Sequence, residues 1–363
     1  MSQSRRITQR DIAARVGVNR ATVSMALHNH PSIPETTRAR VRAVAQELGY
    51  VPDPMLSALA QYRHSRRPAS YQGTIAWVVN NLPPYAWEEV SMFRDYHEGA
   101  RSQAALHGYN LDTFDLNDYP DKPERLANIF RSRNIIGLLL CPQPGPNWKL
   151  NLPVDDFACI TFGYSLRQPL LHTVAPTQFR AMMETMRRLI ALGYHRIGFA
   201  CSFQTDQRTD HNFIGGYFVE NFLGQLDMTL PPIDEETTTP ESFSRWYNEY
   251  KPDAVVTGNP RILDVIRKSG LRVPEDIGVA GPSIPFERGT MSGVYEDSRH
   301  IGKTAVDALV GMINRGERGV PERPLYIHAP GVWVDGETLR QQSKEAEPKR
   351  VRRKGAKAAK AKR

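Results

Sequence analysis

The stretch from Ile7 to Arg67 constrains the fold most strongly, because three short helical patterns follow one another within it. Thr8, with Asp11 three residues later, is typical of a helix N-terminus, and Gly17 stops that helix. Asn19 is placed to cap a second helix almost immediately afterwards. Two short helices joined by so tight a turn predict a helix-turn-helix.

Apolar side chains recur at three- and four-residue spacing along all three patterns, which predicts one small core shared by the helices. The third helix is expected to run from Glu35 to Leu48 and to end at Gly49. The expected core residues are Ile12, Ala13, Val16, Val23, Ala26, Leu27, Val41, Val44, Ala45 and Leu48.

The other face of the second helix carries the residues expected to contact DNA. A helix of this size fits the major groove, where projecting side chains meet base edges and polar groups at its rim bind phosphates. The predicted base-reading residues are Arg20, Ala21 and Met25. The predicted phosphate contacts are Thr8, Asn19, Thr22, Ser24 and Asn29. The alternative is a three-helix bundle whose polar face is only solvated.

The segments "DIAARVGVNRATVS", "NHPSIPETTRARV" and "ELGYVPDP" closely resemble the headpiece of the lactose and galactose repressor (LacI/GalR) family. The resemblance implies a hinge helix from about residue 54 to residue 62. In that family two hinge helices, one per subunit, lie in the minor groove, where a leucine wedges a base step apart. The corresponding leucine is Leu59, with Leu56 and Ser57 beside it. The alternative is that Leu59 is an ordinary leucine of a linker helix.

Two positions depart from the family pattern. Met25 stands where the family usually has an arginine that hydrogen-bonds a guanine, and a methionine cannot make that bidentate contact. Leu56 occupies a hinge position that is usually small, so we expect the two hinge helices to pack at a different separation.

The net charge of +8 is unevenly distributed along the chain. Residues 1–67 hold 11 basic and 4 acidic residues, residues 344–363 hold 10 and 2, and the middle holds 26 and 33. Basic ends around an acidic middle favour a nucleic-acid partner at the ends. The tail, residues 344–363, has too few apolar side chains to bury a core and is expected to be disordered. It either adds salt-sensitive DNA affinity or serves only solubility.

Between residues 68 and 343 apolar strand-like runs alternate with helical patterns, which predicts parallel sheets with helices on both faces. The expected strands are 73–81, 109–116, 135–141, 157–163, 196–202, 253–258, 276–281 and 331–340. The expected helices are 87–107, 123–133, 177–192, 216–225 and one from residue 262. The alternation of strands and helices starts again near residue 177. We therefore expect two doubly wound subdomains, with a ligand at the carboxyl ends of the strands.

The segments "LIALGYHRIGFA", "GLRVPEDIGVAG" and "IGKTAVDAL" also resemble the family, which implies a periplasmic-binding-protein-like core that binds an effector and dimerises. The candidate effector contacts are Asn80, Tyr85, Phe213, Asn259, Ser283 and Glu296. Phe213 replaces the arginine that clamps sugar hydroxyls in the family, and Ser283 replaces an aspartate. Carbohydrates remain one candidate class, but an ordinary sugar effector is not expected. Further candidates at strand ends are Trp87, Tyr164, Arg208 and Asp210.

No catalytic constellation, metal-ligand spacing or phosphate-binding loop stands out, so we expect no enzyme activity, no metal and no cofactor. Cys141, Cys159 and Cys201 lie in apolar strand-like runs and are expected to be buried free thiols. No apolar run is long enough to span a membrane, and the amino terminus does not resemble a secretory signal. The expectation is a cytoplasmic protein associated with the nucleoid, with no membrane partner.

The sequence predicts a DNA-binding headpiece (1–50), a hinge helix and linker (51–67), a two-lobed effector-binding and dimerisation domain (68–343) and a basic tail (344–363). The fold class is a small all-α helix-turn-helix headpiece with a hinge helix, followed by a two-subdomain α/β core. The predicted function is a homodimeric, sequence-specific transcription regulator, with repression as the working expectation, that binds a palindromic double-stranded DNA operator under the control of a small-molecule effector. The rivals are an architectural DNA-binding protein and an enzyme or solute receptor with the same core.

Overall fold

The computed structural model describes residues 7–27, 33–50, 71–80, 86–120, 122–143, 145–224, 226, 230–284 and 291–342. The predicted hinge and the basic tail lie outside the described residues, as do Asn29, Leu56, Ser57, Leu59 and Tyr85. The chain divides into two compact units, each assembled from separate stretches of sequence. The first comprises residues 1–180, 203–213 and 295–332, and the second comprises residues 181–202, 214–294 and 333–363.

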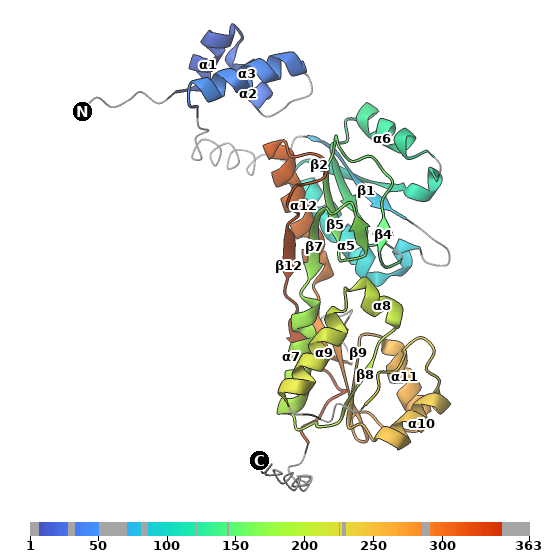
Figure 1. Cartoon of the computed structure of the whole chain (residues 1–363). Coiled ribbons are helices and arrows are strands. Elements are labelled where there is room, and N and C mark those ends of the chain that lie inside the picture. Colours follow the sequence, from blue (N-terminus) through green and yellow to red (C-terminus); the bar gives the residue numbers. More distant parts are fainter. Residues whose placement is uncertain are drawn as a thin grey trace, which may run out of the picture. The chain divides into compact units, whose positions relative to one another are not determined.

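Three helices form the N-terminal headpiece (Figure 1): α1 (Gln9–Val16), α2 (Arg20–Leu27) and α3 (Glu35–Glu47). The predicted start of α1 is confirmed, because the Thr8 backbone N–H and hydroxyl both donate to Asp11 Oδ2, at 2.8 and 2.7 Å. Gly17 ends α1 with a φ of 78°, in the left-handed region that favours glycine. Asn19 follows, and its side-chain oxygen accepts the Thr22 backbone N–H at 2.7 Å, which caps α2.

The headpiece core follows the predicted apolar stripes, with differences at its edge. Its buried members are Ile12, Ala13, Val16, Val23, Ala26, Ile33, Val41 and Ala45. Three residues predicted to be buried are only half-buried and pack at the margin of this core; they are Leu27, Val44 and Leu48. Met25, which was predicted to project away from the core, is also half-buried and packs against it.

A six-stranded sheet forms the centre of the first unit, in the order β12-β7-β5-β3-β1-β2. Every neighbouring pair in this sheet is parallel, as predicted. Its strands are β1 (Gly73–Val79), β2 (Tyr109–Asp115), β3 (Gly137–Leu140), β5 (Ala158–Phe162), β7 (His172–Pro176) and β12 (Tyr326–Ala329). A separate two-stranded sheet pairs β4 (Trp148–Lys149) with β6 (Leu166–Gln168), and neither strand was predicted.

Helices cover both faces of the six-stranded sheet, and the side chains of β1 alternate between them. Ile75 and Trp77 join the apolar cluster that contains α5 (Ser91–Leu106) and α12 (Ser298–Arg315). Ala76 and Val78 join the cluster on the opposite face, against α6 (Pro123–Ser132). Strands buried on both faces carry apolar residues at every position, which explains the continuous apolar runs in the sequence.

The predicted single helix over residues 87–107 is wrong at one point. A short 3-10 helix, η1 (Trp87–Glu89), comes first, and α5 begins only at Ser91. Val90 between them is extended, with φ −86° and ψ 106°, so the helical hydrogen bonds cannot run through it. A second 3-10 turn, η2 (Leu116–Asp118), follows β2.

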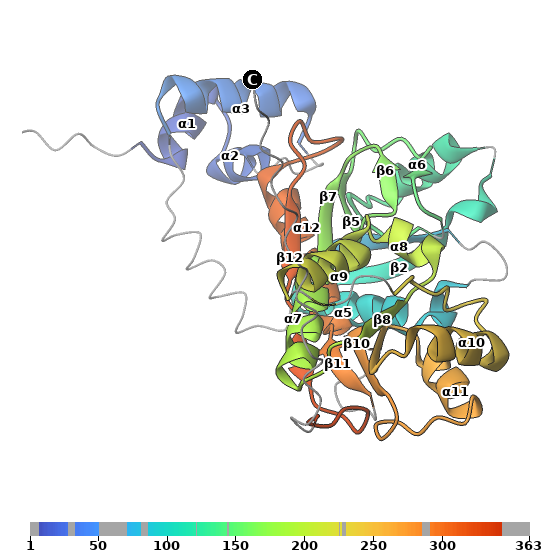
Figure 2. The ribbon, with the colours of Figure 1, turned by 60° about the horizontal axis from the view of Figure 1, so that its bottom comes forward.

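The second unit contains a five-stranded sheet in the order β13-β11-β10-β9-β8. Its strands are β8 (Ile197–Ala200), β9 (Ala254–Thr257), β10 (Gly278–Ile284), β11 (Ser292–Tyr295) and β13 (Val332–Val334). Helices α7 (Gln178–Ala191) and α9 (Asn212–Leu223) lie on one side of this sheet, and α10 (Pro240–Tyr250) and α11 (Pro260–Lys268) lie on the other (Figures 1 and 2). The prediction of two α/β halves with helices on both faces is therefore confirmed. Helices α8 (Phe203–Arg208), α10 and α12 had not been predicted as such.

Candidate nucleic-acid interface and ligand site

The first turn of α2 forms an exposed face of the headpiece. Arg20 and Ala21 are exposed there, whereas Val23 and Ala26 are buried on the opposite side of the helix. Because the buried side is fixed in the headpiece core, Arg20 and Ala21 are held in one orientation. Met25 lies one turn after Ala21 and is partly covered by the core. Two of the three predicted base-reading residues are therefore fully available on one surface.

Three of the headpiece arginines form ion pairs within the headpiece, with two glutamates. Arg15 on α1 pairs with Glu47 on α3 at 3.3 Å. Glu35 pairs with both Arg38 and Arg42, each at 2.7 Å. Exposed ion pairs of this kind add little stability, and because Glu35 is shared they leave one of the three positive charges unbalanced.

Arg10 and Arg20 make no ion pair with a residue that the structure describes, and both are exposed. Neither has an acidic residue three or four positions away in the sequence, where a helical ion pair would form. Arg10 was not singled out by the sequence analysis, although this spacing could have identified it. Arg40 is exposed as well, but it donates to the Val16 carbonyl oxygen at 3.0 Å.

The predicted phosphate contacts differ in how much hydrogen-bonding capacity they have left. The Thr8 hydroxyl donates to Asp11 Oδ2, and the Thr22 hydroxyl donates to Asn19 Oδ1 at 2.9 Å. In this conformation both hydroxyl protons are used inside the headpiece. The Asn19 amide nitrogen is the donor that this arrangement leaves at the start of α2, and Ser24 is half-buried further along the helix.

Polar side chains collect at the carboxyl ends of β1 and β3 in the first unit. Asn80 Nδ2 donates to Gln143 Oε1 at 3.2 Å, and Asn80 Oδ1 accepts from Asn117 Nδ2 at 3.1 Å. The Gln143 backbone N–H in turn donates to Ser165 Oγ at 2.9 Å. Asn80 is thus held in a network that fixes its orientation, as a ligand-positioning side chain requires.

Next to this network lie Tyr96, Cys141, Arg208 and Glu296, which we call the strand-end cluster. The Arg208 guanidinium carbon is 5.8 Å from the centre of the Phe93 ring, and its Nε is buried with no hydrogen-bond partner among the described residues. Burial lowers the pKa of Arg208, while the nearby Cys141 and Tyr96 raise it. Burial, and then the Glu296 carboxylate, raise the pKa of Tyr96 well above its usual value. The cluster therefore holds the partly desolvated guanidinium of Arg208 together with the buried carboxyl group of Glu296.

Other strand-end candidates are engaged with neighbouring side chains. The Tyr164 hydroxyl is 2.9 Å from His328 Nε2, and Asp210 forms an ion pair with Arg167. Phe213, at the first turn of α9, is buried and offers an apolar ring where the family arginine would offer hydrogen bonds. Tyr85 lies outside the described residues.

In the second unit the predicted residues lie at the carboxyl ends of β9 and β10. Asn259 caps α11, because its side-chain oxygen accepts the Arg261 backbone N–H at 3.0 Å, and Ser283 is half-buried in β10. Sequence analysis missed Glu235, which is buried and accepts a hydrogen bond from Thr257 Oγ1 at 3.1 Å. Burial raises the pKa of Glu235.

The described residues contain no group of three or more His, Cys, Asp or Glu side chains that could hold a metal ion. None of the helices in the described ranges is long and apolar enough to cross a membrane. Cys141 and Cys159 are buried free thiols as predicted, whereas Cys201 is only partly buried. Burial raises the pKa of Cys141 well above its usual value, so its thiol is uncharged at neutral pH.

Comparison with known proteins gives matches at both ends of the chain. Residues 8–53 match the model of bacterial regulatory proteins of the lacI family, and residues 186–338 match a periplasmic binding protein-like domain. The repressor PurR of Yersinia pestis bv. Antiqua (strain Antiqua) is 24% identical over 328 residues, which are 84% of this chain and 90% of PurR. The repressor CytR of Escherichia coli (strain K12) is 26% identical over 291 residues, which are 76% of this chain and 79% of CytR.

Solved structures agree with the fold. The lac repressor dimer bound to operator and an anti-inducer matches with a TM-score of 0.55 and 18% identity, over 92% of this chain and 99% of that one. The CelR–cellobiose complex matches with a TM-score of 0.54 and 21% identity, over 92% of this chain and 100% of that one.

A helix-turn-helix headpiece in front of a periplasmic-binding-protein-like core defines a class of DNA-binding transcription regulators. The predicted fold class is therefore confirmed for the headpiece and the core, while the hinge helix lies outside the described residues. As the sequence had indicated, the chain carries a lacI-type helix-turn-helix domain and a periplasmic-binding-protein-like domain, and it is similar to the repressors PurR and CytR.

Proposed function

We propose that this protein is a sequence-specific transcriptional repressor, which binds a palindromic operator as a homodimer and changes its DNA affinity when a small molecule binds its core. The observation that carries the proposal is the exposed first turn of α2. Arg20 and Ala21 stand there on a helix whose other side is fixed by Val23 and Ala26. The names of the relatives PurR and CytR support repression rather than activation.

In the proposed complex α2 lies in the major groove. Arg20 donates to the acceptors of a guanine, and the methyl group of Ala21 contacts a thymine methyl. Met25 is half-buried against the headpiece core, so it adds an apolar contact at most and no hydrogen bond. Asn19 and Arg10 bind phosphates on either side of the helix and set its position without reading sequence.

The homodimer follows from the size of the headpiece, because one helix-turn-helix reads too few base pairs to select a site. Two copies related by a two-fold axis read two half-sites, and the operator then has the matching symmetry. The lac repressor, whose structure resembles this chain, is a dimer on its operator.

The effector is proposed to bind at the carboxyl ends of the strands. The strand-end cluster supports a ligand that brings an oxygen-rich or anionic group to Arg208, whose Nε is buried without a partner among the described residues. Phe213 cannot clamp vicinal hydroxyls, so the ligand differs from a neutral sugar held by the family's arginine. Such a ligand and the operator would affect each other's binding reciprocally, by one coupling free energy.

The experiment that tests this function is genome-wide immunoprecipitation of the tagged protein from its native host at near-physiological salt. A few sharp peaks that share a palindrome are the expected result, and neighbouring genes would point to the effector. Broad coverage without a shared sequence would contradict the proposal and favour an architectural DNA-binding protein.

The hinge leucine gives a first prediction. Leu59→Ala removes the side chain proposed to wedge a base step in the minor groove, so operator affinity is expected to fall about tenfold or more while non-specific binding is unchanged. Titration of operator and of a scrambled duplex, in the same salt, measures both. An equal loss on the two duplexes would mean that Leu59 only packs within the linker.

The basic tail gives a second prediction. Residues 344–363 carry 10 basic and 2 acidic residues, so their removal is expected to flatten the dependence of DNA affinity on salt concentration. The measurement is the slope of log affinity against log salt for the full chain and for the chain ending at residue 343. Identical slopes would show that the tail does not contact DNA and serves solubility.

A further inference from the structure

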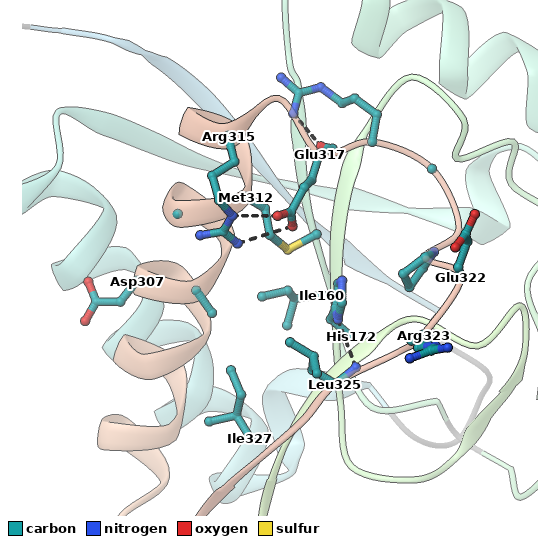
Figure 3. Close-up of a pocket in the computed structure, with 15 residues that line it drawn as sticks. Ile160, His172, Asp307, Met312, Arg315, Glu317, Glu322, Arg323, Leu325 and Ile327 are labelled. Atoms are coloured by element: carbon teal, nitrogen blue, oxygen red, sulfur yellow. Dashed lines mark hydrogen bonds and ion pairs between the residues drawn. The ribbon is translucent and has the colours of Figure 1, made fainter. Parts of the chain in front are cut away.

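A pocket lies in the first unit, away from the strand-end cluster. Its volume is about 500 Å³, and it is bounded by the last turns of α12, by β5, β7 and β12, and by the loop that joins α12 to β12 (Figure 3). His172 is the first residue of β7, and Leu325 directly precedes β12. The pocket therefore reaches the amino edge of the parallel sheet, whereas the strand-end cluster follows the carboxyl ends of the same strands.

The floor of this pocket is apolar. Ile160, Met312, Leu325 and Ile327 line it, and Figure 3 shows Met312 on α12 with Ile160 and Leu325 between that helix and His172. Gly311 opens the wall formed by α12, since a Cβ there would meet only the end of the Arg315 side chain, at 3.1 Å. A floor of this kind accepts a hydrocarbon or aromatic body of a small molecule.

Three of the charged side chains around the pocket have partners of their own. Arg315 pairs with Glu317 at 2.5 Å, and both residues are labelled in Figure 3. Asp307 accepts from Gln103 at 2.7 Å and lies 2.7 Å from His107 Nε2. Glu322 and Arg323, which are exposed, complete the charged rim.

Arg318, Glu322 and Arg323 form no ion pair with a described residue, and of these three Arg318 is the one that is shielded from solvent. Its side chain is half-buried and donates to the Glu317 carbonyl oxygen at 2.6 Å, but it pairs with no carboxylate among the described residues. Burial lowers the pKa of Arg318, which shows that its surroundings disfavour the charge. A guanidinium stays protonated even so, because its pKa is far above neutral. An anion entering the pocket would therefore meet one partly desolvated, unneutralised cation.

His172 supplies a neutral donor to the same pocket. Its Nδ1 accepts the Leu325 backbone N–H at 3.0 Å, so that nitrogen carries no proton and Nε2 does. Burial lowers the pKa of His172, which favours this neutral form. A polar ligand group can accept from Nε2–H without the histidine becoming charged.

We propose that this pocket is a second ligand site, which takes a small amphipathic carboxylate with an apolar body on Ile160, Met312 and Ile327 and its carboxylate toward Arg318. The half-buried Arg318 guanidinium matches a monocarboxylate, because charge-assisted hydrogen bonds to it would neutralise one charge. The site lies at the edge of the sheet where β1 begins, immediately after the linker in the sequence. It does not depend on the proposed effector site or on DNA binding.

The test uses the full-length protein and three probes: phenylacetate, its uncharged analogue phenylacetamide, and acetate, which lacks the apolar body. Isothermal titration or ligand-observed NMR is expected to give binding of phenylacetate at least about tenfold tighter than of either other probe. Inorganic phosphate is a fourth probe, and it is expected not to compete. Equal binding of phenylacetate and phenylacetamide, competition by phosphate, or no binding of phenylacetate would overturn the proposal.

Two variants place the binding in this pocket. Gly311→Leu fills the pocket from α12, and Arg318→Gln removes the unpaired charge; both are expected to abolish the preference for phenylacetate. Lys303→Gln is the matched control, since it removes an exposed charge from α12 outside the pocket and should bind as the wild type does. Circular dichroism checks that each variant is folded. Wild-type binding by folded Gly311→Leu or by Arg318→Gln would locate the site elsewhere and overturn the proposal.

Discussion

Replacing Gly302 by alanine is expected to lower the free energy of unfolding of the first unit by about 3 kcal/mol, the upper end of the usual overpacking cost, because α5 and α12 touch there through their backbones. A Cβ on Gly302 would stand 2.0 Å from the Tyr96 carbonyl oxygen, and a Cβ on Gly99 would stand 2.0 Å from the Arg299 carbonyl oxygen. The helices would have to separate by roughly 1 Å, which opens the apolar cluster between them. Chemical denaturation monitored by circular dichroism measures the loss.

Gly311→Ala, on the same helix, is the control for this prediction. Its Cβ would approach only the flexible end of Arg315, so the substitution removes a helix-interior glycine without a backbone clash. It is expected to leave stability unchanged or raise it by about 0.5–1 kcal/mol. Similar losses for the two variants would mean that the close approach of α5 and α12 does not decide the effect.

The headpiece could be derived from sequence because its signals are local. Thr8 and Asp11 interact across a single turn. Position 17 requires a glycine because its φ lies in the left-handed region. The same holds for the parallel strands, whose apolar runs record burial on two faces. Such features depend on neighbours within a few residues, so the pattern alone determines them.

Features that depend on contacts far along the chain were not predictable. Helix α5 starts after an extended Val90 because residues around it pack on the core, and no breaker residue marks the position. By contrast, α10 was missed although its signals are local: Thr239 caps it, Pro240 is its first residue, and Phe243 and Trp246 form its buried stripe.

The candidate ligand site shows the same division. Asn80 could be placed at a strand end from the sequence, but its partners come from two other segments, Asn117 from η2 and Gln143 from the loop after β3. Arg208 was noted only as part of a polar loop, since its burial near Tyr96 depends on how α8 packs within the first unit. The burial of a charged residue cannot be predicted from the sequence when the residues around it are polar.

Arg20→Ala is expected to weaken operator binding by about 1–3 kcal/mol, or roughly 10- to 100-fold, and to relax specificity at one base pair of each half-site. The reason is that Arg20 is exposed on the first turn of α2 and is not neutralised by any described carboxylate. Competition titrations against operators with each substitution at each position would measure both effects.

Arg15→Ala is the matched control, because it also removes one positive charge from the headpiece. Arg15 is paired with Glu47 at 3.3 Å between exposed side chains, so its loss should change headpiece stability by less than about 1 kcal/mol and leave base preference intact. If Arg20 only contributed charge, the two variants would weaken every duplex alike and the salt dependence would change equally. A loss confined to one base position in Arg20→Ala alone requires that this guanidinium reads a base, which makes α2 the recognition helix.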